Sequence, residues 1–184
     1  FDLQNAQGDT ATCATIMSGF VSSNVDLIMA NATAPLQAAA AATDKIPVLG
    51  TSVTDYATAL DISNWNGTTG RNISGTSDLA PLEDQAKMIK ELVPNAKQVA
   101  ILYCSAEANS VYQAQTIEGY LKDMGIAYKE YSAADSNEIQ AVTTSAITDC
   151  DVVYIPTDNT MAASTEIINN ICTPAKIPVI AGEE

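Results

Sequence analysis

The chain contains no histidine, and this absence removes the commonest partner of catalytic and metal-binding side chains. Without an imidazole base, a serine or cysteine nucleophile lacks its usual proton acceptor. Mixed cysteine and histidine zinc sites are excluded for the same reason. Neither a G-x-S-x-G elbow nor a G-x-G-x-x-G or G-x-x-x-x-G-K-[ST] phosphate loop occurs. We therefore expect no enzyme, no cofactor and no metal site.

Positive charge and long apolar runs are also scarce. Only 8 lysine and arginine residues stand against 22 aspartates and glutamates, which gives a formal net charge of -14. Such a field repels phosphate backbones and anionic membranes, so we do not expect nucleic acid as a partner. No stretch approaches the ~20 apolar residues that span a bilayer, and no secretion signal opens the chain. We expect no direct membrane insertion of this segment.

Cysteine is present, but without the spacing of a metal site. The four cysteines show no C-x-x-C pair; they are Cys13, Cys104, Cys150 and Cys172. Cys150 and Cys172 fall at the ends of expected helices. Two interpretations stay open, a bridge between these two residues or buried free thiols throughout.

What the chain does contain is one motif used twice. An apolar run at 25–30 ends in small polar residues, and a helix-forming stretch then leads to Lys45-Ile-Pro-Val-Leu-Gly50. A second run at 152–155 ends in the same way, and another such stretch leads to Lys176-Ile-Pro-Val-Ile-Ala181. This pattern is typical of a buried parallel strand that feeds a crossover helix. Two similar lobes predict a cleft between them.

Hydrophobic periodicity predicts a regular alternation of strands and helices. We expect strands over 26–30, 46–50, 72–77, 98–103, 127–131, 152–155 and 179–181, and helices over 9–23, 36–42, 81–92, 110–124, 137–148 and 160–171. The turn-rich stretch 64–70 is expected to be a loop, and residues 1–6 look strand-like. The alternation indicates an α/β protein with two doubly wound parallel-sheet lobes, 1–74 and 75–184. Both lobes are interpreted as partial, because the chain looks cut at each end.

Polar residues gather at the carboxyl ends of these strands, where ligands bind in open α/β sheets. Hydroxyls and helix N-termini suit a carboxylate, and acids accept from an ammonium group, so the set suits a zwitterion. The alternative for each residue is a cap on the following helix. The candidate ligand-binding residues are Asn31, Thr33, Thr51, Ser52, Thr76, Ser77, Asp78, Asn109, Ser110, Asp158, Asn159 and Glu183.

Five motifs, in order along the chain, carry a resemblance to a known family. They are Asn72-Ile-Ser-Gly-Thr-Ser-Asp78, Leu92-Val-Pro-Asn-Ala-Lys97, Ile101-Leu-Tyr103 with Asn109-Ser110, Tyr154-Ile-Pro-Thr-Asp-Asn-Thr160 and Ile177-Pro-Val-Ile-Ala-Gly-Glu-Glu184. Together they resemble the substrate-binding lipoproteins of ABC transporters, which are often assigned to tryptophan and other aromatic amino acids. The resemblance implies a type I periplasmic-binding-protein fold whose lobes close on a small ligand and deliver it to a membrane permease. It also implies an extracytoplasmic location, periplasmic or lipid-anchored, and further chain at both ends.

For an amino-acid ligand, the resemblance implies which atoms meet which lobe. The ligand carboxylate would fall on Thr33, Thr51 and Ser52, and the ammonium group on Asp158 and Glu183. We expect Asp158→Ala and Glu183→Ala to weaken binding and to leave the fold largely intact, on the expectation that both acids are exposed. The resemblance favours an aromatic amino acid.

Three other interpretations stay open. A sensor or effector domain with the same fold would signal to a partner when it closes. Nucleosides or sugars would replace the amino acid, although a sugar site usually has more stacking aromatics than this chain provides. An enzyme would use an acid pair or Cys104, which Ser105-Ala106-Glu107 follow; the missing histidine and cofactor loops argue against it.

Overall fold

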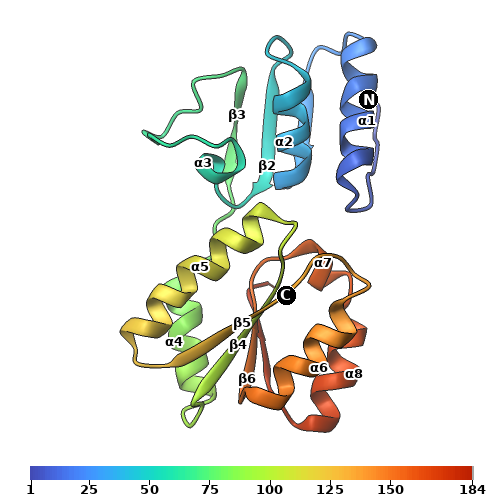
Figure 1. Cartoon of the computed structure of the whole chain (residues 1–184). Coiled ribbons are helices and arrows are strands. Elements are labelled where there is room, and N and C mark those ends of the chain that lie inside the picture. The colour runs from blue at the N-terminus through green and yellow to red at the C-terminus, as the bar shows by residue number, and fades with distance from the viewer. Residues whose placement is uncertain (184) are drawn as a thin grey trace. The chain divides into compact units, whose positions relative to one another are not determined.

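The structure, a computed structural model that describes residues 1–183, separates into two compact units (Figure 1). Unit 1 is Phe1–Leu79 and unit 2 is Ala80–Glu184. The sequence analysis placed the division after residue 74. The structural division falls later because strand β3 (Ile73–Ser77) pairs along its length with the preceding strand of unit 1.

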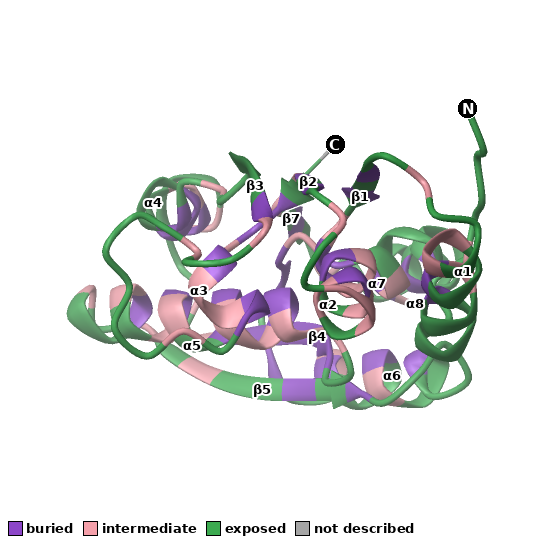
Figure 2. Ribbon diagram, turned by 90° about the horizontal axis from the view of Figure 1, so that it is seen from above, coloured by how far each residue is buried: buried purple, intermediate pink, exposed green. Residues whose placement is uncertain are grey.

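Unit 1 is built on a three-stranded parallel sheet in the order β1-β2-β3. Its other elements are α1 (Thr10–Ser22), β1 (Ile28–Asn31), α2 (Thr33–Ala42), β2 (Val48–Val53) and α3 (Tyr56–Ala59). Ile28 lies opposite Val48, which in turn lies opposite Ile73. These three side chains pack with Leu36 of α2 into one core. Helix α1 packs on α2 and is exposed over most of its length, as Figure 2 shows in green.

Unit 2 is built on a four-stranded parallel sheet in the order β5-β4-β6-β7. Its elements are α4 (Leu82–Leu92), β4 (Gln98–Cys104), α5 (Ala108–Asp123), β5 (Ala127–Ala133), α6 (Ile139–Asp149), β6 (Val152–Ile155), α7 (Asn159–Ala162), α8 (Thr165–Ala175) and β7 (Val179–Ala181). Helices α4 and α5 cover one face of this sheet, and α6 and α8 cover the other (Figure 1).

Strand β4 shows why unit 2 needs helices on both faces. Ile101 packs with the α4 and α5 side chains, whereas the next residue, Leu102, packs with those of α6 and α8. Both residues are fully buried. A strand covered on both faces therefore appears in sequence as a continuous apolar run. The predicted α/β class with parallel sheets is confirmed.

Three local predictions are corrected. Residues 1–6 form no strand. Helix α3 was not predicted; Asp55 starts it by accepting a hydrogen bond from the Thr58 N–H at 2.7 Å. The single helix expected over 160–171 is two helices, because the chain ends α7 at Ala162 and restarts after Ser164.

Tyr56 lies against two glycines of the unit 1 sheet. Its hydroxyl donates to the Thr76 carbonyl at 3.4 Å, and burial raises the pKa of this phenol. A Cβ built on Gly50 or on Gly75 would collide with the Tyr56 hydroxyl, and the one on Gly75 would also collide with the Gly50 carbonyl. Glycine is thus required at both positions for the ring to fit.

Two acids and a tyrosine meet on the α5 side of unit 2. The Tyr103 hydroxyl donates a short hydrogen bond to Glu130 on β5, and Glu118 of α5 interacts with the same carboxyl group. Burial and the neighbouring Glu130 raise the pKa of Glu118 to about 7. The pKa of Glu130 is lowered because its carboxylate accepts hydrogen bonds from Tyr103 and from the protonated Glu118.

This pair predicts a pH-dependent stability. The folded protein holds a proton on Glu118 that the unfolded chain releases near pH 4.5. The contribution of this group to the free energy of unfolding is therefore complete below pH 4.5 and is lost as the pH rises to 7. Glu130 titrates lower and acts outside this window. We therefore expect the free energy of unfolding to fall between pH 5 and 7. The fall should be only about 1 kcal/mol, because solvent exposure weakens the interaction between the two carboxyl groups. Urea titrations should show this fall in the wild type and not in Glu118→Gln, and an equal fall in both would refute the assignment. The exposed Glu91→Gln is the control.

Candidate functional site

In unit 1, the carboxyl ends of β1 and β2 present the start of helix α2. Asn31 at the end of β1 lies opposite Thr51, whose carbonyl accepts the Ala32 N–H at 2.9 Å. Thr33 opens α2 and is only 4% exposed. The N-cap residue Ala32 offers no side-chain acceptor, so the N–H groups of the first turn have no cap. Uncapped N–H groups beside threonine hydroxyls favour an anion.

The rest of the unit 1 edge is the end of β2 and β3. Ser52 is exposed and adopts a left-handed backbone, with φ of 54°, at an irregularity in the pairing of the two strands. Ser77 donates its hydroxyl to the Thr54 carbonyl at 3.0 Å, so part of its hydrogen-bonding capacity is used within the unit. Thr76 and Asp78 are exposed at the same edge. The structure thus brings all seven unit 1 candidates to one edge of this sheet.

In unit 2, Asp158 is not the exposed acid that the sequence analysis expected. The residue is 1% exposed. One oxygen accepts the Cys104 N–H at 2.6 Å and the other accepts the Met161 N–H at 2.8 Å, while the Ser110 hydroxyl also interacts with it. Burial, followed by the charge of Glu107, raises the pKa of Asp158. Asp158 therefore caps α7 and ties it to the end of β4.

Glu107, which the sequence analysis named beside Cys104 but not as a ligand-binding residue, binds the two residues that follow Asp158. Its Oε2 accepts from the N–H and the side-chain amide of Asn159, at 3.1 and 2.7 Å. Its Oε1 accepts from the N–H and the hydroxyl of Thr160, at 2.8 and 2.7 Å. Burial raises the pKa of Glu107, but the hydrogen bonds from Thr160 and Asn159 outweigh burial and hold it below its usual value.

Asn109 and Ser110 also contact this turn, Asn109 at the Thr157 carbonyl and Ser110 at the Asp158 side chain. The Asn109 side-chain amide donates to the Thr157 carbonyl at 3.1 Å, and Gln113 donates to the same carbonyl at 3.1 Å. Asn109 is 7% exposed and Ser110 is fully buried. Of the five unit 2 candidates, only Asn159 and Glu183 are exposed, so the structure assigns the other three to holding the turn in place.

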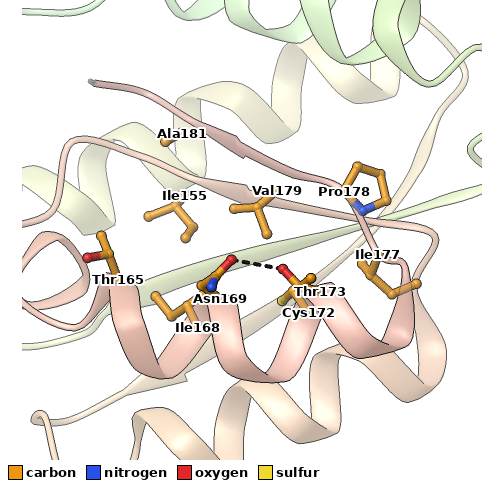
Figure 3. A pocket seen from close by; sticks show the side chains of 10 residues that line it. All are labelled: Ile155, Thr165, Ile168, Asn169, Cys172, Thr173, Ile177, Pro178, Val179 and Ala181. Atoms are coloured by element: carbon orange, nitrogen blue, oxygen red, sulfur yellow. Dashed lines mark hydrogen bonds between the residues drawn. The ribbon is translucent and has the colours of Figure 1, made fainter.

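A separate pocket of about 360 Å³ lies on the α8 side of the unit 2 sheet (Figure 3). Its lining is largely apolar, with Ile155 and Val179 facing Ile168 and Cys172. The polar side chains drawn there include Asn169, which accepts a hydrogen bond from Thr173 at 2.8 Å. The lining contains no charged group, so this pocket does not suit a zwitterion.

Comparison with known proteins gives the family. The family described as "ABC transporter substrate binding protein" matches residues 1–184. The chain belongs to this family. Such substrate-binding proteins are receptors for solutes and not enzymes.

Individual relatives of this substrate-binding protein agree with the family assignment. A "Tyrosine-binding protein" of Clostridioides difficile (strain R20291) is 37% identical over 183 residues, which are 100% of this chain and 53% of that protein. The crystal structure of an ABC domain in complex with L-Trp from Streptococcus pneumonia is 30% identical with a TM-score of 0.92, covering 97% of this chain and 62% of that one. The chain thus spans about half the length of the curated relative and under two thirds of the solved one.

More distant structures show the fold. A branched-chain amino acid transporter substrate-binding protein from Streptococcus pneumoniae, in complex with isoleucine, is 17% identical with a TM-score of 0.64 and covers 97% of this chain and 50% of that one. The fold is the type I periplasmic-binding-protein fold that the resemblance implied. Within residues 1–183, no helix is both long and apolar enough to cross a bilayer.

The cysteines of this substrate-binding protein are four free, buried thiols. The alternative of a bridge between Cys150 and Cys172 is therefore wrong. The Cys104 side chain is 2% exposed, and its sulfur lies 3.7 Å from the Ala134 carbonyl. This thiol packs in the core, and its surroundings offer no support for a nucleophile.

Proposed function

We propose that this protein is the extracytoplasmic receptor of an ABC uptake transporter, and that it binds an aromatic amino acid between its two units and delivers it to the permease. The relatives named for tyrosine and for a tryptophan complex support the ligand class. The observation that carries the proposal is the chemical difference between the two strand-end edges. The first turn of α2 in unit 1 has no side-chain cap, whereas the first N–H groups of α7 in unit 2 are already bonded to carboxylates.

Unit 1 is proposed to bind the ligand carboxylate. The first turn of α2 starts at Thr33 and has no side-chain cap, and Thr51 lies opposite Asn31 with Ser52 next along β2. A carboxylate in this position would replace the missing cap and be stabilised by the helix dipole. Asn31 would add an amide donor at the same edge.

Unit 2 is proposed to bind the ligand ammonium group. The first N–H groups of α7 are already taken by the protein's own carboxylates, from Glu107 and Asp158. A third carboxylate, that of the ligand, would find these donors occupied and would be repelled by the two acids. Glu183 is exposed at the end of β7 and replaces the buried Asp158 as the proposed ammonium partner.

Calorimetric titration of the full-length protein tests this function. We expect saturable binding of tyrosine, tryptophan or phenylalanine, and no binding of leucine or of a nucleoside. Tyrosinamide, which lacks the carboxylate, and N-acetyltyrosine, which lacks the ammonium group, should each bind far more weakly than tyrosine. Silence toward all amino acids would overturn the proposal.

The Glu183→Gln variant isolates the ammonium contact. We expect its affinity for tyrosine to fall about tenfold or more, because a hydrogen bond to a charged group is worth roughly 1.5–3 kcal/mol. Its affinity for N-acetyltyrosine should not change, and its thermal transition should match the wild type because Glu183 is exposed. The exposed Glu166→Gln serves as the control. Equal affinities for tyrosine in Glu183→Gln and wild type would remove Glu183 from the site.

A further inference from the structure

Glu107 occupies an unusual place for a glutamate. It is the N-cap residue of α5, yet its side chain makes no capping hydrogen bond to that helix. Short polar side chains are the preferred caps, because a long one reaches past the first turn. Here the longer side chain reaches a turn that follows 52 residues later in the chain.

Glu107 accepts most of its hydrogen bonds from one short segment, helix α7. Helix α7 has only four residues, so most of its N–H groups need partners outside the helix. Glu107 accepts the N–H groups of Asn159 and Thr160, and Asp158 accepts the N–H of Met161. The Asn109 amide also approaches Glu107 Oε2, at 3.3 Å.

Two carboxylates beside one turn repel each other, and the charge of Glu107 contributes to the raised pKa of Asp158. The arrangement persists because each carboxylate receives backbone N–H donors, which stabilise the charged form. The turn from Thr157 to Thr160 is therefore held from two sides, by Asp158 toward β4 and by Glu107 toward the β4–α5 loop.

We propose that Glu107 is a positioning residue for the ligand: it locks the turn 157–160 to the β4–α5 loop and fixes the edge that unit 2 presents to the amino acid. The proposal rests on the proposed function for its ligand. Its role is indirect, because both oxygens of Glu107 are already occupied by the protein's own donors.

The Glu107→Gln substitution tests the link with almost no change in size. A glutamine keeps one acceptor oxygen, but its amide nitrogen cannot accept from an N–H group. The substitution therefore weakens the contact between the turn 157–160 and the β4–α5 loop. The matched control is Asp151→Asn, because Asp151 also accepts two backbone N–H groups, from Lys97 and Gln98, but at the opposite ends of the unit 2 strands.

The first readout needs no ligand. In two-dimensional NMR spectra of the full-length protein, we expect the Asn159 and Thr160 amide protons to move together as Glu107 titrates, below the usual range of a glutamate because its pKa is lowered, whereas the Met161 amide follows the titration of Asp158, whose pKa is raised. In Glu107→Gln the low-pH movement of Asn159 and Thr160 should vanish. In Asp151→Asn it should remain. Unchanged titration in Glu107→Gln would overturn the link.

The second readout is affinity. Glu107→Gln should bind tyrosine about three- to tenfold more weakly, and Asp151→Asn should bind as the wild type does. A released turn with unchanged affinity would overturn the positioning role. If the wild type binds no amino acid at all, the proposed function fails and the positioning role fails with it, while the amide titration still decides whether the link exists.

Discussion

Replacing Gly75 with alanine is expected to destabilise unit 1 by about 3–5 kcal/mol or to prevent it from folding. Gly75 has a φ of 155°, a conformation that side chains with a Cβ rarely adopt. The added Cβ would also collide with the Gly50 carbonyl and with the Tyr56 hydroxyl, so β2, β3 and α3 cannot all keep their places. Urea denaturation followed by Trp65 emission measures the effect, since the single tryptophan lies in unit 1.

Two further variants separate the causes. Combining Gly75→Ala with Tyr56→Phe removes the hydroxyl and should restore only a small part of the stability, because the clash with the Gly50 carbonyl stays. Gly119→Ala is the control, since a Cβ there meets open space on α5 and should stabilise unit 2 by roughly 0.5–1 kcal/mol. A Gly75→Ala protein with the wild-type midpoint would show that the strands adjust freely.

Replacing Asp158 with alanine is expected to cost about 3 kcal/mol in the stability of unit 2. The change leaves the Cys104 and Met161 N–H groups without their acceptor in a site that is 1% exposed. Each buried N–H without a partner costs ~1–3 kcal/mol. Asp158→Asn should lie between alanine and wild type, because one amide oxygen can satisfy only one of the two N–H groups well. Circular dichroism during urea denaturation measures the order of the three proteins.

This result would reverse the expectation drawn from the sequence, which treated Asp158 as an exposed ligand contact. The two roles give different outcomes. A structural Asp158 lowers the unfolding midpoint, and binding weakens only through the damaged turn. If Asp158→Ala kept the wild-type midpoint and lost all affinity for tyrosine, Asp158 would be a direct ammonium partner after all.

Local patterns predicted the elements well and their interactions poorly. The continuous apolar run of β4 and the N-cap signal of Asp158 are properties of neighbouring residues, and the structure has both. The link from Glu107 to Asn159 and Thr160 joins residues that lie 52 and 53 positions apart, and no periodicity marks such a pair. The break between α7 and α8 at Ser164 was not predicted, because residues 160–166 contain no glycine or proline to indicate the end of a helix.

The absence of long-range contacts from local sequence patterns also explains the mixed outcome for the candidate residues at the strand ends. Sequence reasoning placed polar residues at the correct edges of the sheets, because strand direction alone decides that. It did not separate those that face solvent, such as Asn159 and Glu183, from those that are buried, such as Ser110. That distinction depends on side-chain packing between distant segments.

The reactivity of the four buried thiols can be used to measure how often each unit opens locally. A cysteine shielded in a core reacts with an alkylating reagent only during the moments when its surroundings open. Cys13 lies in unit 1, and the other three share one core on the α6 and α8 side of unit 2. The rate of alkylation, resolved by mass spectrometry of peptides, would therefore measure the opening rate of each unit separately, without any mutation.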